Sequence, residues 1–243
     1  AGALPRLASP YDAQPTAAHR VLVALHREGR LDRWVQQNHD GLPQKAGYPQ
    51  HRLNEIHGAW FDPSNPVVPM DGTLREDLLQ QLIDWEDDAD LVLAFGSTLC
   101  GMNADRLCTS AANRARAGRP DQFGLVIANL QQTQYDHLCS LRIFARLDDV
   151  LAALAVEMQL PVDEAAPAPP EGDVFEVLYD ESGMPAASPS TLDLRPGARV
   201  RFVRQPEWDG RRAGTLAMVV GRTPCGDWEL ELPAAGRRRL GGW

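Results

Sequence analysis

Residues 35–58 read VQQNHDGLPQKAGYPQHRLNEIHG, and this stretch contains two strand-like runs that both end in polar groups. The first run ends in Gln-Asn-His-Asp-Gly at 37–41, and the second ends in His57-Gly58. A short helical segment between them ends at Gly47, a residue type that commonly ends helices. Hydrogen-bonding side chains at the ends of adjacent strands raise the prospect of a ligand site at one edge of a sheet.

Helical and strand-like segments alternate on both sides of this stretch. Helical periodicity predicts helices over 16–29, 75–86, 103–117 and from Asp148 or Asp149 to Met158. Strands are predicted over 33–37, 52–57, 91–95, 124–129 and 141–145. The runs LVLAF and GLVIAN are continuously apolar, which is typical of parallel strands buried on both faces. The alternation predicts an α/β fold with a doubly wound, mostly parallel sheet.

Three of the predicted strands end in polar or small residues, namely Gln37-Asn38, Gly96-Ser97 and Asn129. In doubly wound sheets, ligands bind outside the carboxyl ends of the strands. Each of these residues alone is typical of the start of a loop. Together at one edge, they favour a nucleotide-like ligand.

The end of the chain has a different pattern. Residues 161–172, PVDEAAPAPPEG, are rich in Pro, Ala and acidic residues and predict a semi-rigid linker. Short β-like runs follow it, including VFEVLYD, GTLAMVVGR and DWELELP. We therefore predict three parts: a ligand-binding domain over 1–160, a linker over 161–172, and a small all-β domain over 173–243 that forms an SH3-like barrel.

Composition narrows the functional classes. Hydrophobic residues make up 44% of the 243-residue chain and charged residues 23%, as in ordinary globular proteins. A net charge of −9 argues against direct binding to nucleic acid or to an anionic membrane. No apolar run approaches the ~18 residues of a membrane span. The N-terminus has no signal-peptide pattern and resembles a piece cut from a longer chain.

The four cysteines, Cys100, Cys108, Cys139 and Cys225, are scattered and lack the close pairing of a zinc site. Few, unpaired cysteines suit a reducing compartment. We therefore expect an intracellular protein, cytoplasmic or nuclear, that holds no metal.

The motifs occur in an order that resembles the sirtuin family. QNHDGL, KAG and NEIHG are followed by ADLVLAFGSTL, LVIANLQQTQYD and LRIFARLDDVLAAL, so the resemblance covers residues 11–158. It implies a Rossmann-like domain with a small inserted module. It also implies NAD-dependent removal of acyl groups from protein lysines, in which the acyl group passes to ADP-ribose and nicotinamide is released. The implied partners are NAD and an acylated-lysine protein or peptide.

The same resemblance implies roles for single residues. His57 falls at the catalytic base, and histidine suits that role because its ordinary pKa of ~6.5 lies near neutrality. A single histidine in a sequence more often has a structural role. The position of His57 within the ordered motifs favours a catalytic role instead. The implied cofactor-binding residues are Gln37 at the nicotinamide ribose, Asn38 and Asp40 at the nicotinamide, and Gly96, Ser97 and Asn129 on the phosphate and adenosine-ribose side. Val67 and Val68 fall where the family adds the acyl-lysine peptide as an extra strand.

Two departures from the family pattern keep other functions open. Residues 1–15 contain no Gly-Ala-Gly-x-Ser loop, which in the family presents backbone N–H groups to the pyrophosphate. The interval between His57 and Leu91 contains no cysteine, so the zinc ribbon is missing. The alternatives are a catalytically silent NAD- or ADP-ribose-binding module, whose C-terminal barrel binds a protein partner, and an enzyme that hydrolyses NAD with water.

Overall fold

The structure is a computed structural model that describes residues 13–60, 62, 65–163, 172–179, 185–202, 214–223, 227–233 and 236–240. These residues leave out residues 1–12, most of the predicted linker and Cys225.

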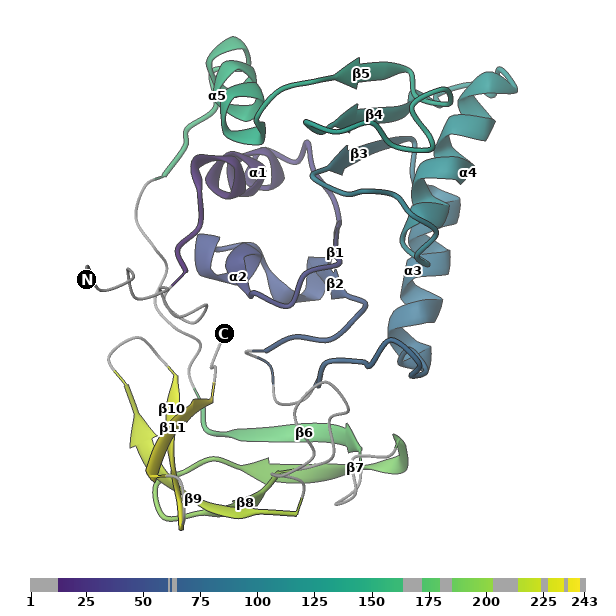
Figure 1. The fold of residues 1–243 in the computed structure, drawn as a ribbon. Coiled ribbons are helices and arrows are strands. Elements are labelled where there is room, and N and C mark those ends of the chain that lie inside the picture. The colour runs from purple at the N-terminus through teal and green to yellow at the C-terminus, as the bar shows by residue number, and fades with distance from the viewer. Residues whose placement is uncertain are drawn as a thin grey trace, which may run out of the picture.

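Residues 13–163 form alternating helices and parallel strands (Figure 1). The helices are α1 (Ala17–Arg27), α2 (Leu42–Ala46), α3 (Glu76–Asp88), α4 (Asp105–Arg116) and α5 (Leu147–Glu157), with a 3₁₀ turn at Gln50–Arg52. The strands are β1 (Trp34–Gln36), β2 (Leu53–Glu55), β3 (Leu91–Phe95), β4 (Gly124–Ala128) and β5 (Leu141–Ile143). All the predicted helices and strands of this part are observed, with ends that differ by at most a few residues.

The strands pair in parallel, as predicted, and their hydrogen bonds divide them into two sheets. β1 pairs with β2, placing Val35 opposite Asn54. β4 lies between β3 and β5, with Leu93 opposite Val126 and Ile127 opposite Arg142. The parallel α/β architecture is thus confirmed, although the described residues form two sheets instead of one continuous sheet.

The prediction that residues 91–95 are buried on both faces was wrong for the start of the strand. Leu91 is 41% exposed, whereas Leu125 and Ile127 of β4 are fully buried. The difference follows from position, because β3 is an edge strand of its sheet and β4 is central. A continuous apolar run does not distinguish these two positions.

The helices pack in two groups around the sheets. α1 lies against α5, and Val21, Leu22 and Leu25 of α1 share a core with the fully buried Leu151 of α5. α3 runs beside α4 at the other side (Figure 1). Arg106 Nε of α4 lies 2.8 Å from Glu86 Oε2 of α3, which joins the two helices at a largely buried carboxylate.

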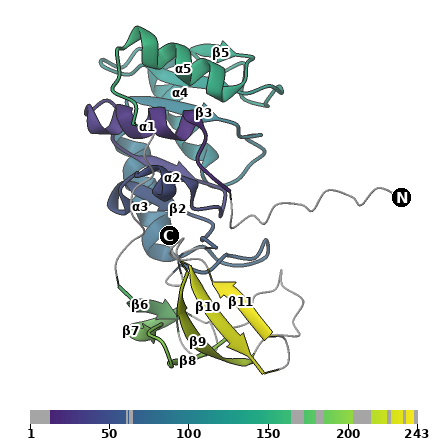
Figure 2. The same ribbon diagram turned by 90° about the vertical axis from the view of Figure 1, so that its left-hand side faces the viewer.

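The C-terminal strands are antiparallel, and Figure 2 shows them as a separate layer below the α/β part. β6 (Val174–Tyr179) pairs with β7 (Pro185–Asp193). β8 (Arg199–Arg201), β9 (Leu216–Arg222), β10 (Trp228–Leu232) and β11 (Gly236–Leu240) form a sheet in the order β11-β10-β9-β8. Trp228, 1% exposed, is at the centre of their core. An all-β antiparallel part is confirmed, and the SH3-like barrel and the domain boundaries stay predictions.

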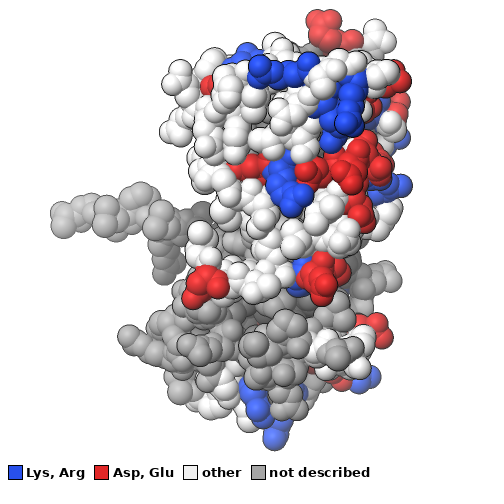
Figure 3. All heavy atoms as spheres, turned by 90° about the vertical axis from the view of Figure 1, so that its right-hand side faces the viewer, with Lys and Arg blue, Asp and Glu red and all other residues white. Residues whose placement is uncertain are grey.

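Two surface properties bear on the functional class. None of the described helices is long and apolar enough to cross a bilayer. On the face formed by α3 and α4, basic side chains are interspersed with acidic ones (Figure 3). Asp88 of α3 forms an ion pair with Arg33 at 3.0 Å.

Candidate active site

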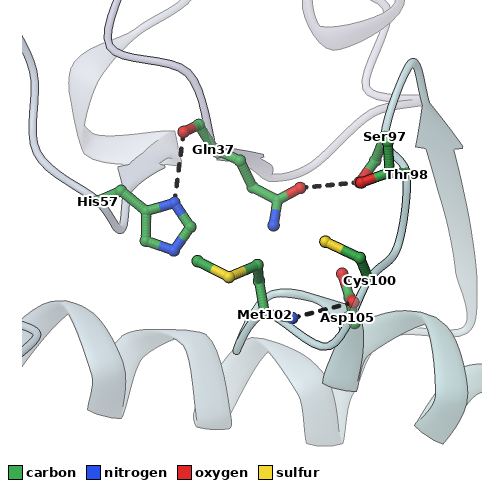
Figure 4. A pocket seen from close by; sticks show the side chains of 7 residues that line it. All are labelled: Gln37, His57, Ser97, Thr98, Cys100, Met102 and Asp105. Carbon is green, nitrogen blue, oxygen red and sulfur yellow. Dashed lines mark hydrogen bonds between the residues drawn. The ribbon is translucent and has the colours of Figure 1, made fainter. Parts of the chain in front are cut away.

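A pocket of about 200 Å³ lies beyond the carboxyl ends of β1, β2 and β3 (Figure 4). Its position agrees with the edge at which doubly wound folds bind ligands. Three predicted site residues line it, and they come from three separate strand ends. The lining residues are Gln37, His57, Ser97, Thr98, Cys100, Met102 and Asp105.

His57 follows β2 and presents its imidazole to this pocket (Figure 4). Its Nδ1 lies 3.3 Å from the Gln37 carbonyl oxygen. Because a carbonyl only accepts, Nδ1 carries the proton and Nε2 keeps its lone pair in the neutral ring. Nε2 is buried and has no hydrogen-bond partner among the described residues. Burial lowers the pKa of His57 below its ordinary value of 6.5, with the Gln37 carbonyl opposing that shift. The geometry thus leaves a neutral base facing the pocket.

Gly58 fixes the backbone that follows this histidine. Its φ is +84°, and a Cβ built on it would lie 2.3 Å from the Pro66 carbonyl oxygen and 2.6 Å from Val67 Cα. Only glycine fits such a conformation and such a close approach. The space beside Gly58 is thus filled by the protein's own backbone at residues 66–67.

Gln37, Ser97 and Asn129 form one hydrogen-bonded chain across the strand ends. The Ser97 hydroxyl donates to Gln37 Oε1 at 3.0 Å, and Asn129 Nδ2 donates to the Ser97 carbonyl at 2.8 Å. The Gln37 amide nitrogen is then left pointing into the pocket (Figure 4). Gly96, with a φ of +63°, turns the chain between β3 and Ser97. The structure therefore brings together four of the predicted cofactor-binding residues.

Of the six predicted cofactor-binding residues, Gln37 and Ser97 line the pocket, and Asn38, Asp40, Gly96 and Asn129 do not. Asn38 is exposed. Asp40 Oδ1 accepts hydrogen bonds from Gln36 Nε2 at 3.2 Å and from the Leu42 backbone N–H at 3.1 Å. Asp40 therefore stabilises the start of α2 in this structure, and its predicted contact with nicotinamide stays a prediction.

Val67 and Val68 lie in a segment without helix or strand, which is not part of the described sheets. The Val68 backbone N–H donates to the His57 carbonyl oxygen at 2.9 Å, so this segment is tied directly to the histidine. Neither valine lines the pocket. Their role in peptide binding stays a prediction.

Sequence reasoning missed the far wall of the pocket. Cys100, Met102 and Asp105 come from the loop after β3 and the first residue of α4. Asp105 Oδ2 accepts hydrogen bonds from the backbone N–H groups of Gly101, at 2.7 Å, and Met102, at 3.2 Å. The one available signal was an acidic residue at a predicted helix start, which is common and carries little information about a site.

The four-cysteine zinc site of the resembled family does not fit this chain. The interval from His57 to Leu91 has no cysteine. No group of three or more His, Cys, Asp or Glu side chains among the described residues is arranged to hold a metal ion. Cys100, Cys108 and Cys139 are free thiols.

The geometry defines a Rossmann-like domain with a pocket beyond its strand ends, and comparisons with known proteins agree. The Sir2 family model matches residues 4–64. The NAD-dependent protein deacetylase SRT1 of Arabidopsis thaliana is 26% identical over 216 residues, which are 74% of this chain and 43% of that protein. Human NAD-dependent protein deacetylase sirtuin-7 is 27% identical over 194 residues, 62% of this chain and 47% of that protein.

The solved structures agree in fold. A Sir2 protein solved with a p53 peptide and NAD⁺ superposes with a TM-score of 0.53 at 23% identity, covering 62% of this chain and 72% of that one. Together with the ordered motifs, these findings show that the chain is similar to proteins of the sirtuin family in sequence and in fold. The chain spans less than half the length of the two curated relatives named above.

Proposed function

We propose that this protein is an NAD-dependent protein-lysine deacylase of the sirtuin type, which transfers the acyl group to ADP-ribose and releases nicotinamide. The observation that carries the proposal is His57, whose Nδ1 faces the Gln37 carbonyl while its unpartnered Nε2 faces a pocket shared with Gln37 and Ser97. This is the arrangement that a general base requires before substrate binds.

The other groups of the site have matching chemistry. In the proposed complex, the Gln37 amide nitrogen would donate to a ribose hydroxyl, and Nε2 of His57 would accept a ribose hydroxyl proton. Gly96, Ser97 and Asn129 would hold the phosphate and adenosine-ribose side. Asn38 and Asp40 would complete the nicotinamide end. Val67 and Val68 would pair with the acyl-lysine peptide, and NAD itself supplies the reactive glycosidic bond.

Relatives support the substrate class. The curated relatives are named NAD-dependent protein deacetylases, and solved neighbours include Sir2 bound to an acetylated peptide. We propose the same pair of substrates, NAD and an acylated-lysine protein, for an intracellular protein in the cytoplasm or nucleus. Direct binding to nucleic acid or membrane is not part of the proposal. The C-terminal β domain is proposed to bind a protein partner.

The test is nicotinamide release by the full chain with NAD and an acetyl-lysine peptide. His57→Ala is expected to lower the rate by roughly 10²- to 10⁴-fold, the usual contribution of a general base. His51→Ala is the matched control, because His51 is exposed on the 3₁₀ turn, away from the pocket. Equal rates in the wild type and His57→Ala would refute the catalytic assignment.

Two further results would select the alternatives. Nicotinamide release that needs no peptide would indicate NAD hydrolysis. Binding of NAD or ADP-ribose in calorimetry, with no turnover, would indicate a silent binding module.

A further inference from the structure

Two buried polar atoms without a described protein partner belong to side chains that line the same pocket. One is His57 Nε2 and the other is Asp105 Oδ1, and neither has a hydrogen-bond partner among the described residues. Asp105 is 3% exposed, and both side chains line the pocket of about 200 Å³ (Figure 4). Buried polar atoms are normally paired, so each such atom needs a physical explanation.

The structural role of Asp105 accounts for one carboxylate oxygen only. Oδ2 accepts the backbone N–H groups of Gly101 and Met102 and so orders the loop that leads into α4. That role leaves Oδ1 buried without compensation, which is unfavourable in a folded protein unless a ligand supplies a donor.

Both unpaired atoms are acceptors. The Gln37 carbonyl holds the proton of His57 on Nδ1, so Nε2 presents a lone pair, and a carboxylate oxygen accepts as well. A ligand that satisfies both atoms must therefore bring donors. Hydroxyl groups fit, because they are small and neutral and leave His57 uncharged. The sulfur atoms of Cys100 and Met102 provide apolar contacts beside them.

We infer that Asp105 is a binding residue whose Oδ1 accepts a hydrogen bond from a hydroxyl group of the ligand in this pocket. The inference rests on the proposed function for the identity of that ligand. The hydroxyl has two sources: the ribose at the nicotinamide end of the dinucleotide, or a hydroxylated acyl chain on the substrate lysine. The two sources share one chemistry and are separable by experiment.

Asp105→Asn is the informative variant. The amide can keep its oxygen on the N–H groups of Gly101 and Met102 while its NH₂ replaces Oδ1, so an acceptor becomes a donor with little change in shape. Asp105→Ser is the second variant, since a hydroxyl can still accept from the loop but cannot reach as far into the pocket. Asp121→Asn is the control, because Asp121 is exposed beyond the opposite end of α4.

Calorimetry with ADP-ribose and with ADP tests the ribose source. If the distal ribose is the donor, both Asp105 variants weaken ADP-ribose binding about tenfold and leave ADP binding unchanged, because only ADP-ribose carries that ribose. For the acyl source, binding of a 3-hydroxybutyryl-lysine peptide is compared with that of a butyryl-lysine peptide. The wild type would then prefer the hydroxylated peptide, and the variants would lose that preference.

Either pattern supports the inference and identifies the hydroxyl. Two ratios of affinity are compared: ADP-ribose against ADP, and the 3-hydroxybutyryl-lysine peptide against the butyryl-lysine peptide. If both ratios are the same in the wild type and the two Asp105 variants, the inference is refuted. It is also refuted if the wild type binds none of these four ligands. These are binding measurements, so they also separate this inference from the proposed function: an inactive wild type that shows the Asp105 effect would refute deacylation and leave the binding role intact.

Discussion

Glu55 is the buried group whose ionisation should affect stability most strongly. It is the last residue of β2 and is 1% exposed. Burial raises the pKa of its carboxyl from 4.5 to about 7, and the nearby Asp62 and Asp40 charges add to the rise. The amides of Gln44 and Gln50 oppose it without forming a hydrogen bond of normal geometry to either carboxylate oxygen.

The sign and size of the effect follow from proton linkage. Between pH 4.5 and about 7, the folded state keeps the Glu55 proton and the unfolded state loses it, so the free energy of unfolding falls as pH rises. The pKa difference is 7 − 4.5 = 2.5 units. At 1.36 kcal/mol per unit, the full loss above pH 7 is about 3 kcal/mol, a sizeable part of the roughly 5–15 kcal/mol of a typical domain.

Glu55→Gln removes this titration while keeping a side chain of similar shape. We expect the wild type to lose about 3 kcal/mol more than Glu55→Gln between pH 4.5 and pH 8, measured by urea unfolding at several pH values. Glu28→Gln is the control, because Glu28 is exposed after α1 and should leave the wild-type pH profile unchanged. Parallel profiles for wild type and Glu55→Gln would refute the reasoning and place the ionised carboxylate in a solvated or paired environment.

Two further predictions concern the residues around His57. Gly58→Ala should destabilise the fold by about 1–3 kcal/mol more than Gly29→Ala in urea unfolding. Both glycines have positive φ, but only Gly58 has backbone atoms within 3 Å of an added Cβ. Equal losses of stability would show that the backbone at residues 66–67 can shift to admit the added Cβ. The acid limb of kcat/KM for nicotinamide release should have its midpoint below pH 6.5, because burial lowers the pKa of His57 and the base must be neutral to act. A midpoint above 6.5 would contradict the desolvated base.

The strand ends could be predicted from sequence because their signals are local. The polar residues after β1 and the His-Gly pair after β2 stand beside apolar or strand-like runs, and their order along the chain matches the family. Gln37, His57 and Ser97 were identified in this way and do meet in one pocket.

The features that were missed depend on tertiary contacts. The segment LNE of β2 is polar in two of its three residues, yet all three residues are buried. Asn54 is covered from the side of α3, where its Nδ2 donates to the Leu78 carbonyl at 2.8 Å. Asp105 is missed for a related reason, because its burial depends on how the loop after β3 folds back over the pocket. No periodicity in the sequence encodes either contact.

The site also has a structural role that the sequence could not reveal. The described strands form two parallel sheets, and Gln37 follows one of them while Ser97 follows the other. The Ser97–Gln37 hydrogen bond therefore joins the two sheets at the pocket itself. A ligand that contacts Gln37, His57 and Ser97 together would bind only when the sheets are correctly placed. Ligand binding should accordingly stabilise the whole α/β part by mass action, by roughly 2.7 kcal/mol at a ligand concentration of one hundred times Kd. The polar strand ends thus line the pocket and also form a hydrogen bond between the two sheets that border it.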